Sequence, residues 1–126
     1  MTVRFRIRTL MATVALVAFA LALPVELRAR RERRRLASNG AYYLKVATVH
    51  DRERAVCESA AGRKPYDSIE RQATQVSWLY GCPNFRDWPD EAAWHASMAE
   101  ECRRSATSIG REEQAVRRRL LLPVIF

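Results

Sequence analysis

Two histidines and two cysteines recur at one spacing and are the clearest candidates for chemistry in this chain. His50 precedes Cys57 by seven residues, and His95 precedes Cys102 by the same interval. On antiparallel helices the two pairs could face each other, and imidazole and thiolate are ligands that zinc accepts. Seven helical residues span about 10.5 Å, whereas zinc bonds measure about 2.0–2.3 Å. We interpret the spacing as a repeated heptad position and expect no metal and no other cofactor.

The same residues raise the question of a cysteine nucleophile activated by histidine. Such a nucleophile needs an activating environment and an oxyanion hole, and no pattern in the sequence indicates either. Cys102 falls on an apolar stripe, where a thiol behaves as a small hydrophobic group. We therefore expect no catalytic residue and no enzyme activity.

The third cysteine, Cys82, makes the number of thiols odd, and none of them stands in a C-x-x-C pair. An odd number without paired spacing is a poor disulfide framework. It favours a reducing compartment.

The element that dominates the chain is an uncharged run of 17 residues, Thr9 to Val25, with arginines on both sides. A helix of this length spans about 25 Å, close to the lower limit for a hydrocarbon core about 30 Å thick. We predict a transmembrane anchor with membrane-facing side chains at Leu10, Val14, Leu16, Val17, Phe19, Leu21 and Leu23. The predicted headgroup flanks are Arg4, Arg6, Arg8, Arg28, Arg30, Arg31, Arg33, Arg34 and Arg35.

A cleaved signal peptide is the alternative interpretation of this segment. It has a basic start, an apolar stretch from Leu10 to Leu23, and Ala20-Leu21-Ala22 as a cleavage site, so cleavage would fall at about residue 22. Six arginines follow within eight positions, Arg28 to Arg35. Because such a cluster acts as a stop-transfer flank, the anchor is the favoured interpretation.

The arginines also predict the orientation and exclude one class of partner. Three precede the apolar run and six follow it, so the positive-inside rule places the C-terminal domain in the cytoplasm.

Residues 1–35 carry nine Arg and two Glu, whereas residues 36–126 carry 13 Lys or Arg and 12 Asp or Glu. The net charge of +8 therefore belongs mainly to the membrane flanks. A nearly neutral domain lacks the electrostatic attraction that dominates nonspecific DNA binding, so we expect no nucleic-acid partner.

The opening RFRIRTLM, the V-A-L-V-A run and the arginine cluster resemble a large group of short, uncharacterised bacterial single-pass membrane proteins. Those proteins begin with RFRLRTLM-like segments and have an arginine-rich exit. The resemblance covers residues 4–35 well, and beyond them only Ala41-Tyr42-Tyr43-Leu44 and Trp94-His95-Ala96 are similar. The Pro-rich tail of many relatives is absent. The resemblance implies membrane anchoring and no enzyme activity.

Glycine and proline divide the remainder, residues 36–126, into helical patterns at about 41–61, 67–80 and 89–120. Ser38-Asn39-Gly40 is expected to loosen the junction with the anchor, and Asp87 or Asp90 can cap the last helix. The expected fold is all-α: a transmembrane helix and then a helical hairpin or a two-to-three-helix antiparallel bundle. The apolar seams are narrow and coiled-coil-like, running through Tyr42, Val46, Val49, Val56 and Ala60; Ile69, Ala73, Val76 and Tyr80; and Trp94, Met98, Cys102, Ala106, Ile109, Val116 and Leu120.

Five aromatic residues lie close together around the turn between the last two helical patterns: Trp78, Tyr80, Phe85, Trp88 and Trp94. They predict either a small aromatic core that closes the turn or an exposed surface for a protein partner.

The tail from Leu120 to Phe126 could dip into the bilayer interface or pack against the helices. The predicted partners are thus the lipid bilayer and another protein, or a second copy of the chain bound through its helices. The predicted function is an interaction or scaffolding module, and the alternative is an exported structural protein of the envelope.

Overall fold

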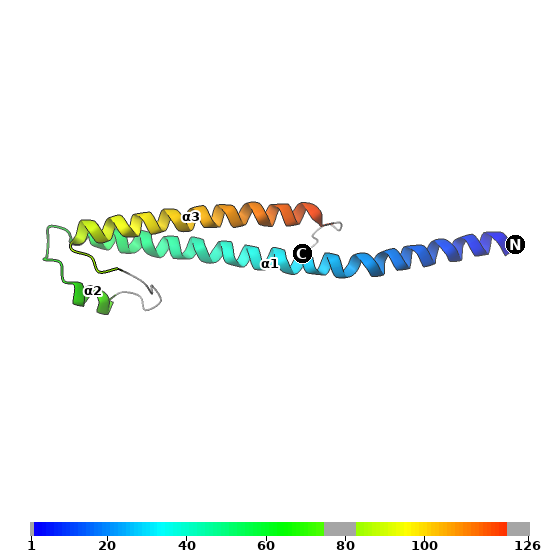
Figure 1. Ribbon diagram of the computed structural model, residues 1–126, viewed down its shortest axis with the longest axis horizontal. Helices are drawn as coiled ribbons and strands as arrows, with labels where there is room; N and C mark the ends of the chain where they lie inside the picture. Colours follow the sequence, from blue (N-terminus) through cyan, green and yellow to red (C-terminus); the bar gives the residue numbers. More distant parts are fainter. Residues whose placement is uncertain (1, 75–82, 121–126) are drawn as a thin grey trace. The chain divides into compact units, whose positions relative to one another are not determined.

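The computed structural model describes residues 2–74 and 83–120, with side chains described for 6–71 and 83–120. Within these ranges lie three helices: α1 (Thr2–Ala60), α2 (Ser68–Thr74) and α3 (Trp88–Arg119) (Figure 1). Those ranges hold no strand. The prediction of an all-α fold is confirmed, with a long N-terminal helix that packs with a C-terminal helix.

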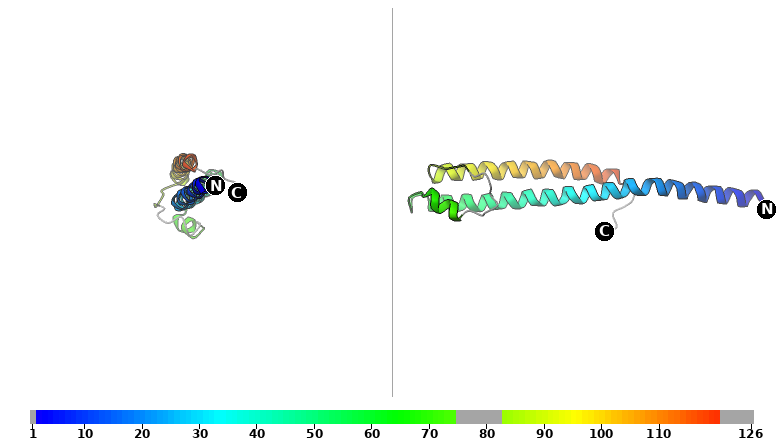
Figure 2. Two further views of the ribbon diagram at one scale, coloured as in Figure 1. Left: turned by 90° about the vertical axis from the view of Figure 1, so that its right-hand side faces the viewer. Right: turned by 60° about the horizontal axis from the view of Figure 1, so that its bottom comes forward.

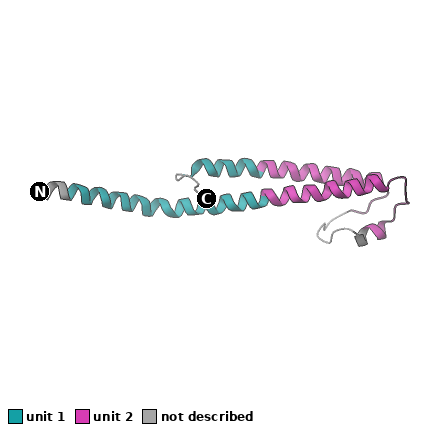
Figure 3. Ribbon diagram, turned by 180° about the vertical axis from the view of Figure 1, so that it is seen from behind, with its two compact units in different colours: residues 1–39, 109–126 teal, residues 40–108 magenta. Residues whose placement is uncertain are grey.

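The chain divides into two compact units (Figure 3). Unit 1 comprises residues 1–39 and 109–126, and unit 2 comprises residues 40–108. The division near residue 39 lies close to the boundary expected at residue 35. The C-terminal part of α3, however, groups with the anchor segment. Within each unit α1 and α3 lie side by side, as Figure 2 also shows.

Helix α1 continues through two residues that usually weaken helices, Pro24 and Gly40. The expected loosening at Ser38-Asn39-Gly40 is therefore wrong, and no new helix begins near residue 41. One internal glycine costs a helix only about 1 kcal/mol, a cost that the helix-forming residues around it, such as Ala41 and Leu44, offset. Proline removes one backbone hydrogen bond, and the helix continues beyond it.

Helix ends occur where the sequence indicates. Gly62 follows α1 with a φ of 80°, a left-handed conformation that L side chains rarely adopt and that commonly ends helices. Asp67 caps α2, because its Oδ1 accepts hydrogen bonds from the amides of Ile69 and Glu70 at 2.9 and 3.2 Å. Asp87 rather than Asp90 caps α3, since the Asp90 amide donates to Asp87 Oδ1 at 2.8 Å.

The buried faces differ in part from the predicted apolar seams. Tyr42 and Val56 of α1 and Ile69 of α2 are exposed. The buried positions of the three helices are Glu26, Ala47, His50 and Cys57 on α1, Arg71 on α2, and Trp88, Glu91, His95, Ala99, Cys102 and Val116 on α3. Of these, Cys102 and Val116 belong to the predicted seams. A seam drawn from apolar residues alone misses this face because its centre is polar. The predicted continuation of the second helix to residue 80 lies outside the described residues, as does the tail beyond residue 120.

Candidate functional site

Six polar side chains from all three helices meet inside unit 2. We call them the polar cluster: His50, Glu53 and Cys57 of α1, Arg71 of α2, and Glu91 and His95 of α3. All except Glu53 are buried, and Cys57, Glu91 and His95 are completely or almost completely shielded. Polar groups at this depth cost free energy unless they are paired, so their contacts decide whether the cluster is structural or reactive.

Arg71 supplies the positive charge of the cluster. Its guanidinium donates to Glu91 through Nη2 at 2.6 Å and through Nε at 3.1 Å, and to Glu53 Oε2 through Nη2 at 2.9 Å. Burial alone would lower the pKa of Arg71, but the hydrogen bonds that it donates to Glu91 and Glu53 outweigh burial and raise the pKa. One guanidinium therefore ties the short helix α2 to both long helices.

The two histidines of the cluster form a direct hydrogen bond. His50 Nδ1 lies 2.8 Å from His95 Nδ1, so one nitrogen donates and the other accepts. His95 Nε2 lies 3.5 Å from Glu91 Oε1, too far for a good hydrogen bond but close enough for the carboxylate to favour a proton on Nε2. We therefore assign His95 as the Nε2–H tautomer, whose Nδ1 accepts the hydrogen bond that His50 Nδ1–H donates.

Both imidazoles are held neutral by their surroundings. Burial lowers the pKa of His50, helped by His95 and opposed by Asp51 and Glu53. Burial also lowers the pKa of His95, against the opposing effect of Glu91. At neutral pH both imidazoles of the cluster are therefore uncharged.

Cys57, Glu91 and His95 place potential metal-ligand atoms within 4.8 Å of one another. Arg71 already occupies the place of a cation there, since its Nη2 lies 2.6 Å from Glu91 Oε1 and 3.7 Å from Cys57 Sγ. Burial, together with the negative charge of Glu91, raises the pKa of the Cys57 thiol to about 11. A protonated thiol next to a guanidinium is neither a ready metal ligand nor a nucleophile. The arrangement is that of an ion-paired interior, in which one guanidinium bridges two glutamates.

The repeated His–Cys spacing brings the histidines together but not the cysteines. Cys57 follows His50 along α1, and Cys102 follows His95 along α3, which runs in the opposite direction (Figure 1). Each cysteine thus lies about 10 Å along the axis from the histidine on its own helix, in opposite directions from the histidine pair. Across the helix pair, however, the Cys57 thiol lies within 4.8 Å of a His95 ring nitrogen. Both cysteines are buried and free. They cannot join both histidines around one metal ion. Cys82 lies outside the described residues.

Aromatic side chains enclose the polar cluster. The Trp88 indole donates to the Lys64 carbonyl at 3.0 Å, and its ring lies 5.5 Å from the Arg71 guanidinium carbon. Trp94 packs edge-on against His50 and His95, with centroid distances of 5.4 and 5.0 Å.

The predicted aromatic set therefore has a packing role where it is described. Phe85 and Trp88 are buried and Trp94 is half-buried, which matches the expected small core rather than the exposed partner surface. The other two members, Trp78 and Tyr80, lie outside the described residues.

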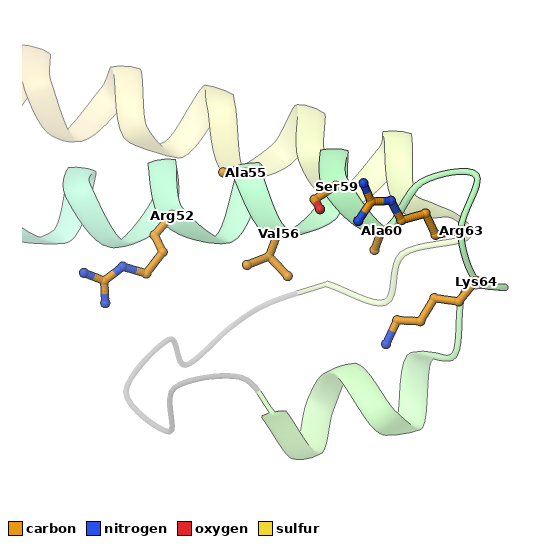
Figure 4. Close-up of a pocket in the computed structure, with 7 residues that line it drawn as sticks. All are labelled: Arg52, Ala55, Val56, Ser59, Ala60, Arg63 and Lys64. Atoms are coloured by element: carbon orange, nitrogen blue, oxygen red, sulfur yellow. The ribbon is translucent and has the colours of Figure 1, made fainter.

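Among the described residues of unit 2, one open groove borders the polar cluster at Cys57, and another lies along α1 without a member of the cluster in its lining. One, of about 400 Å³, lies between α1 and α3 and is lined by Arg54, Cys57, Glu58, Ala61, Trp88, Pro89, Ala92, Ala93 and Ala96. The other, of about 660 Å³, lies along α1, where Arg52 and Val56 point away from α3 (Figure 4). Arg63 and Lys64 give this second groove a basic end.

The anchor residues predicted in unit 1 are all exposed. Leu16 and Leu21 have 71% of their surface free, and Leu23, the least exposed of the seven, has 39%. The flanking arginines from Arg6 to Arg35 lie on the same helix, and Arg4 belongs to it although its side chain is not described. This helix is long and apolar enough to cross a membrane.

Sequence reasoning missed Arg71, Glu91 and the inward direction of Glu53. A signal for them was present, since Glu53 interrupts the apolar stripe of α1 at a seam position. A charged residue at such a position indicates a partner of opposite charge, but the sequence does not show that α2 supplies it.

Comparisons of the chain with protein families, curated proteins and solved structures gave no match. Function must therefore be argued from the geometry of the chain.

Proposed function

We propose that this chain is a single-pass membrane protein whose α1 spans the bilayer at about residues 9–25 and whose unit 2 is an interaction or scaffolding module. The observation that carries the proposal is the exposure of large apolar side chains around the whole of α1 in this run. A helix that is apolar on every side is either buried in protein or surrounded by lipid. The resemblance of residues 4–35 to single-pass membrane proteins supports the second choice.

The arginines support an orientation with unit 2 in the cytoplasm. Six of them follow the apolar run and three precede it, and basic residues are retained on the cytoplasmic side. The buried, unpaired thiols of Cys57 and Cys102 are compatible with a reducing compartment.

The interior of unit 2 supports a binding role more than a catalytic one. Its titratable groups are paired or neutral, and α2 is fixed to both long helices through Arg71. Such an interior holds a surface rigid, and the groove beside Ala92, Ala93 and Ala96 offers small side chains between which a partner or a second copy can pack.

Membrane extraction tests the anchor. The chain is expected to stay with membranes through both high-salt and carbonate washes, because burial of the apolar run, rather than arginine charge, retains it. Replacing Leu16 and Phe19 with Arg is expected to abolish insertion, at about 2.5–3.5 kcal/mol for each central charge. Release of the unaltered chain by salt alone would contradict the anchor, and an intact mass lacking residues 1–22 would favour the cleaved, exported alternative.

Site-specific photo-crosslinking tests the interaction role. A photoreactive residue at Ala93, in the groove, is expected to capture a partner or a second copy in membranes. The same residue at Ser97, which is also exposed on α3 but does not line the groove, is the matched control. Equal labelling at both positions, or none, would argue against this groove as the binding surface.

A further inference from the structure

In unit 1, arginines at the end of α3 lie close to the arginines of α1 that follow the apolar run. Within unit 1, drawn in teal in Figure 3, Arg33 Nε donates to Glu113 Oε1 at 3.3 Å, and this contact fixes the register of α3 against α1. From Glu113 to Arg119 is six residues, or about 9 Å along the helix axis. Because α3 runs antiparallel to α1, Arg117, Arg118 and Arg119 reach the level of residues 27–29, beside the end of the apolar run.

These arginines point in several directions around the helix pair. Arg28, Arg31 and Arg34 of α1 are exposed and spaced three apart, which places them along one side of the helix, whereas Arg33 faces α3. Arg117, Arg118 and Arg119 are exposed on successive positions of α3, about 100° apart. We call the six exposed residues, without Arg33, the arginine collar: Arg28, Arg31, Arg34, Arg117, Arg118 and Arg119.

Acidic residues neutralise only part of this region. Residues 26–35 and 111–119 contain ten Arg and four Glu. Glu26 pairs with Arg30 and Glu113 pairs with Arg33, so two of the four carboxylates are engaged by arginines outside the collar. The collar therefore keeps a strong positive charge at the surface.

We propose that the arginine collar binds anionic phospholipid headgroups of the bilayer that α1 spans. The proposal rests on the membrane anchoring proposed above. The guanidinium is suited to phosphate because its planar donors can bind two oxygens at once, and clusters of four to eight basic residues next to a membrane segment attract anionic lipid. Exposed Val25 and Leu27 lie directly beside the collar, so the polyanion nearest to it is a lipid surface.

The lipid composition around the full-length chain tests this proposal. The chain is reconstituted in phosphatidylcholine vesicles with a minor fraction of phosphatidylglycerol, extracted with its surrounding lipid by an amphipathic polymer, and analysed by mass spectrometry. Phosphatidylglycerol is expected to be enriched several-fold over its bulk fraction. Each basic residue at an anionic surface strengthens association about fivefold, so Arg117→Gln, Arg118→Gln and Arg119→Gln together should remove most of the enrichment.

Two variants control for charge and for folding. Arg52→Gln, Arg63→Gln and Arg86→Gln make the same charge change at exposed positions of unit 2 and are expected to leave the enrichment intact. Lysine at positions 117–119 should restore most of it, and circular dichroism should show the same helicity for every variant. Enrichment that is absent from the parent chain, or equal in the glutamine variant and the parent, would overturn the proposal.

Further arms separate lipid from other phosphates and from failure of the anchor. Inorganic phosphate or a short oligonucleotide, added at constant ionic strength, is expected to leave the enrichment unchanged, and displacement by either would overturn the lipid assignment. Carbonate extraction of the same vesicles tests the anchor separately. A chain that is retained without enrichment contradicts only the lipid proposal, whereas a chain that is released contradicts the proposed function itself.

Discussion

Arg71 is the residue on which the interior of unit 2 depends, because it alone in the polar cluster carries a positive charge against Glu53 and Glu91. Buried ion pairs gain little over a well-packed apolar interior, but removing one partner leaves an uncompensated charge. Arg71 is therefore important because its loss would leave buried carboxylate charge unpaired, and not because its ion pairs are strong.

Arg71→Met is expected to destabilise unit 2 by about 3–5 kcal/mol, since Glu91 would stay buried without its guanidinium. The measurement is chemical denaturation of the full-length chain in detergent micelles, followed by circular dichroism. Arg103→Gln is the matched control, because its ion pair with Asp51 is exposed and should contribute less than about 1 kcal/mol. Adding Glu91→Gln to Arg71→Met should recover part of the loss, and an Arg71→Met chain as stable as the parent would refute this account of the cluster.

Acid is expected to destabilise the chain through the histidine pair. The pKa values of His50 and His95 are lowered in the folded state by burial, so their contribution to stability is complete above the unfolded value of 6.5 and is lost as pH falls below it. The fall in unfolding free energy is at most about 1.4 kcal/mol per pH unit for each histidine. Thermal melts at pH 7.5 and 5.0 measure it.

Other charged groups around the pair set the control for this experiment. Glu53, Glu91 and Asp51 oppose the lowering, and Arg71 contributes to it at His95. Replacing both histidines with Asn should flatten the profile between pH 7.5 and 5.0. An equally steep profile in that variant would assign the acid sensitivity to the carboxylates instead.

At the scale of the elements, the sequence specifies helix ends better than helix faces. Gly62, Asp67 and Asp87 each act through their own backbone or the next turn, so local sequence is sufficient to predict them. The faces of α1 and α3 depend on what lies opposite, and a seam of apolar residues predicts inward positions for Tyr42 and Val56, which the structure exposes. The charge of Glu53 is accommodated only because α2, distant in sequence, brings Arg71 to it.

Two glycines in different helical contexts give opposite predictions for the same substitution. Gly62→Ala is expected to destabilise the chain by about 1 kcal/mol, because a φ of 80° is strained for alanine although no atom lies within 4 Å of the added carbon. Gly110→Ala is expected to stabilise it by up to about 1 kcal/mol, since that glycine lies inside α3 with open space around it. Melting temperatures that move in the same direction would contradict the assignment of Gly62 as the end of α1.

For the whole molecule, the apolar run and its two arginine flanks could be read directly from composition, and the exposed side chains of unit 1 agree with that reading. The grouping of residues 109–126 with the anchor segment could not, because it depends on the register between α1 and α3. Within unit 1 the ion pair between Arg33 and Glu113 records that register, and neither residue is distinctive in a sequence with so many charges.

Orientation in the membrane is tested by thiol labelling, and burial decides which thiols can report it. Cys57 and Cys102 are buried, so the natural cysteines at these positions would fail to react on either side of the membrane. We therefore place a reporter at Ser97, which is exposed on α3, with Cys57 and Cys102 changed to Ala and Cys82 to Ser. If unit 2 is cytoplasmic, an impermeant maleimide should leave Ser97→Cys unlabelled in intact cells and label it after permeabilisation. Thr2→Cys, which precedes the apolar run, should show the opposite pattern in the same background, because a single span separates the two positions. Labelling of Ser97→Cys from outside intact cells would place unit 2 in the exterior and favour the envelope alternative.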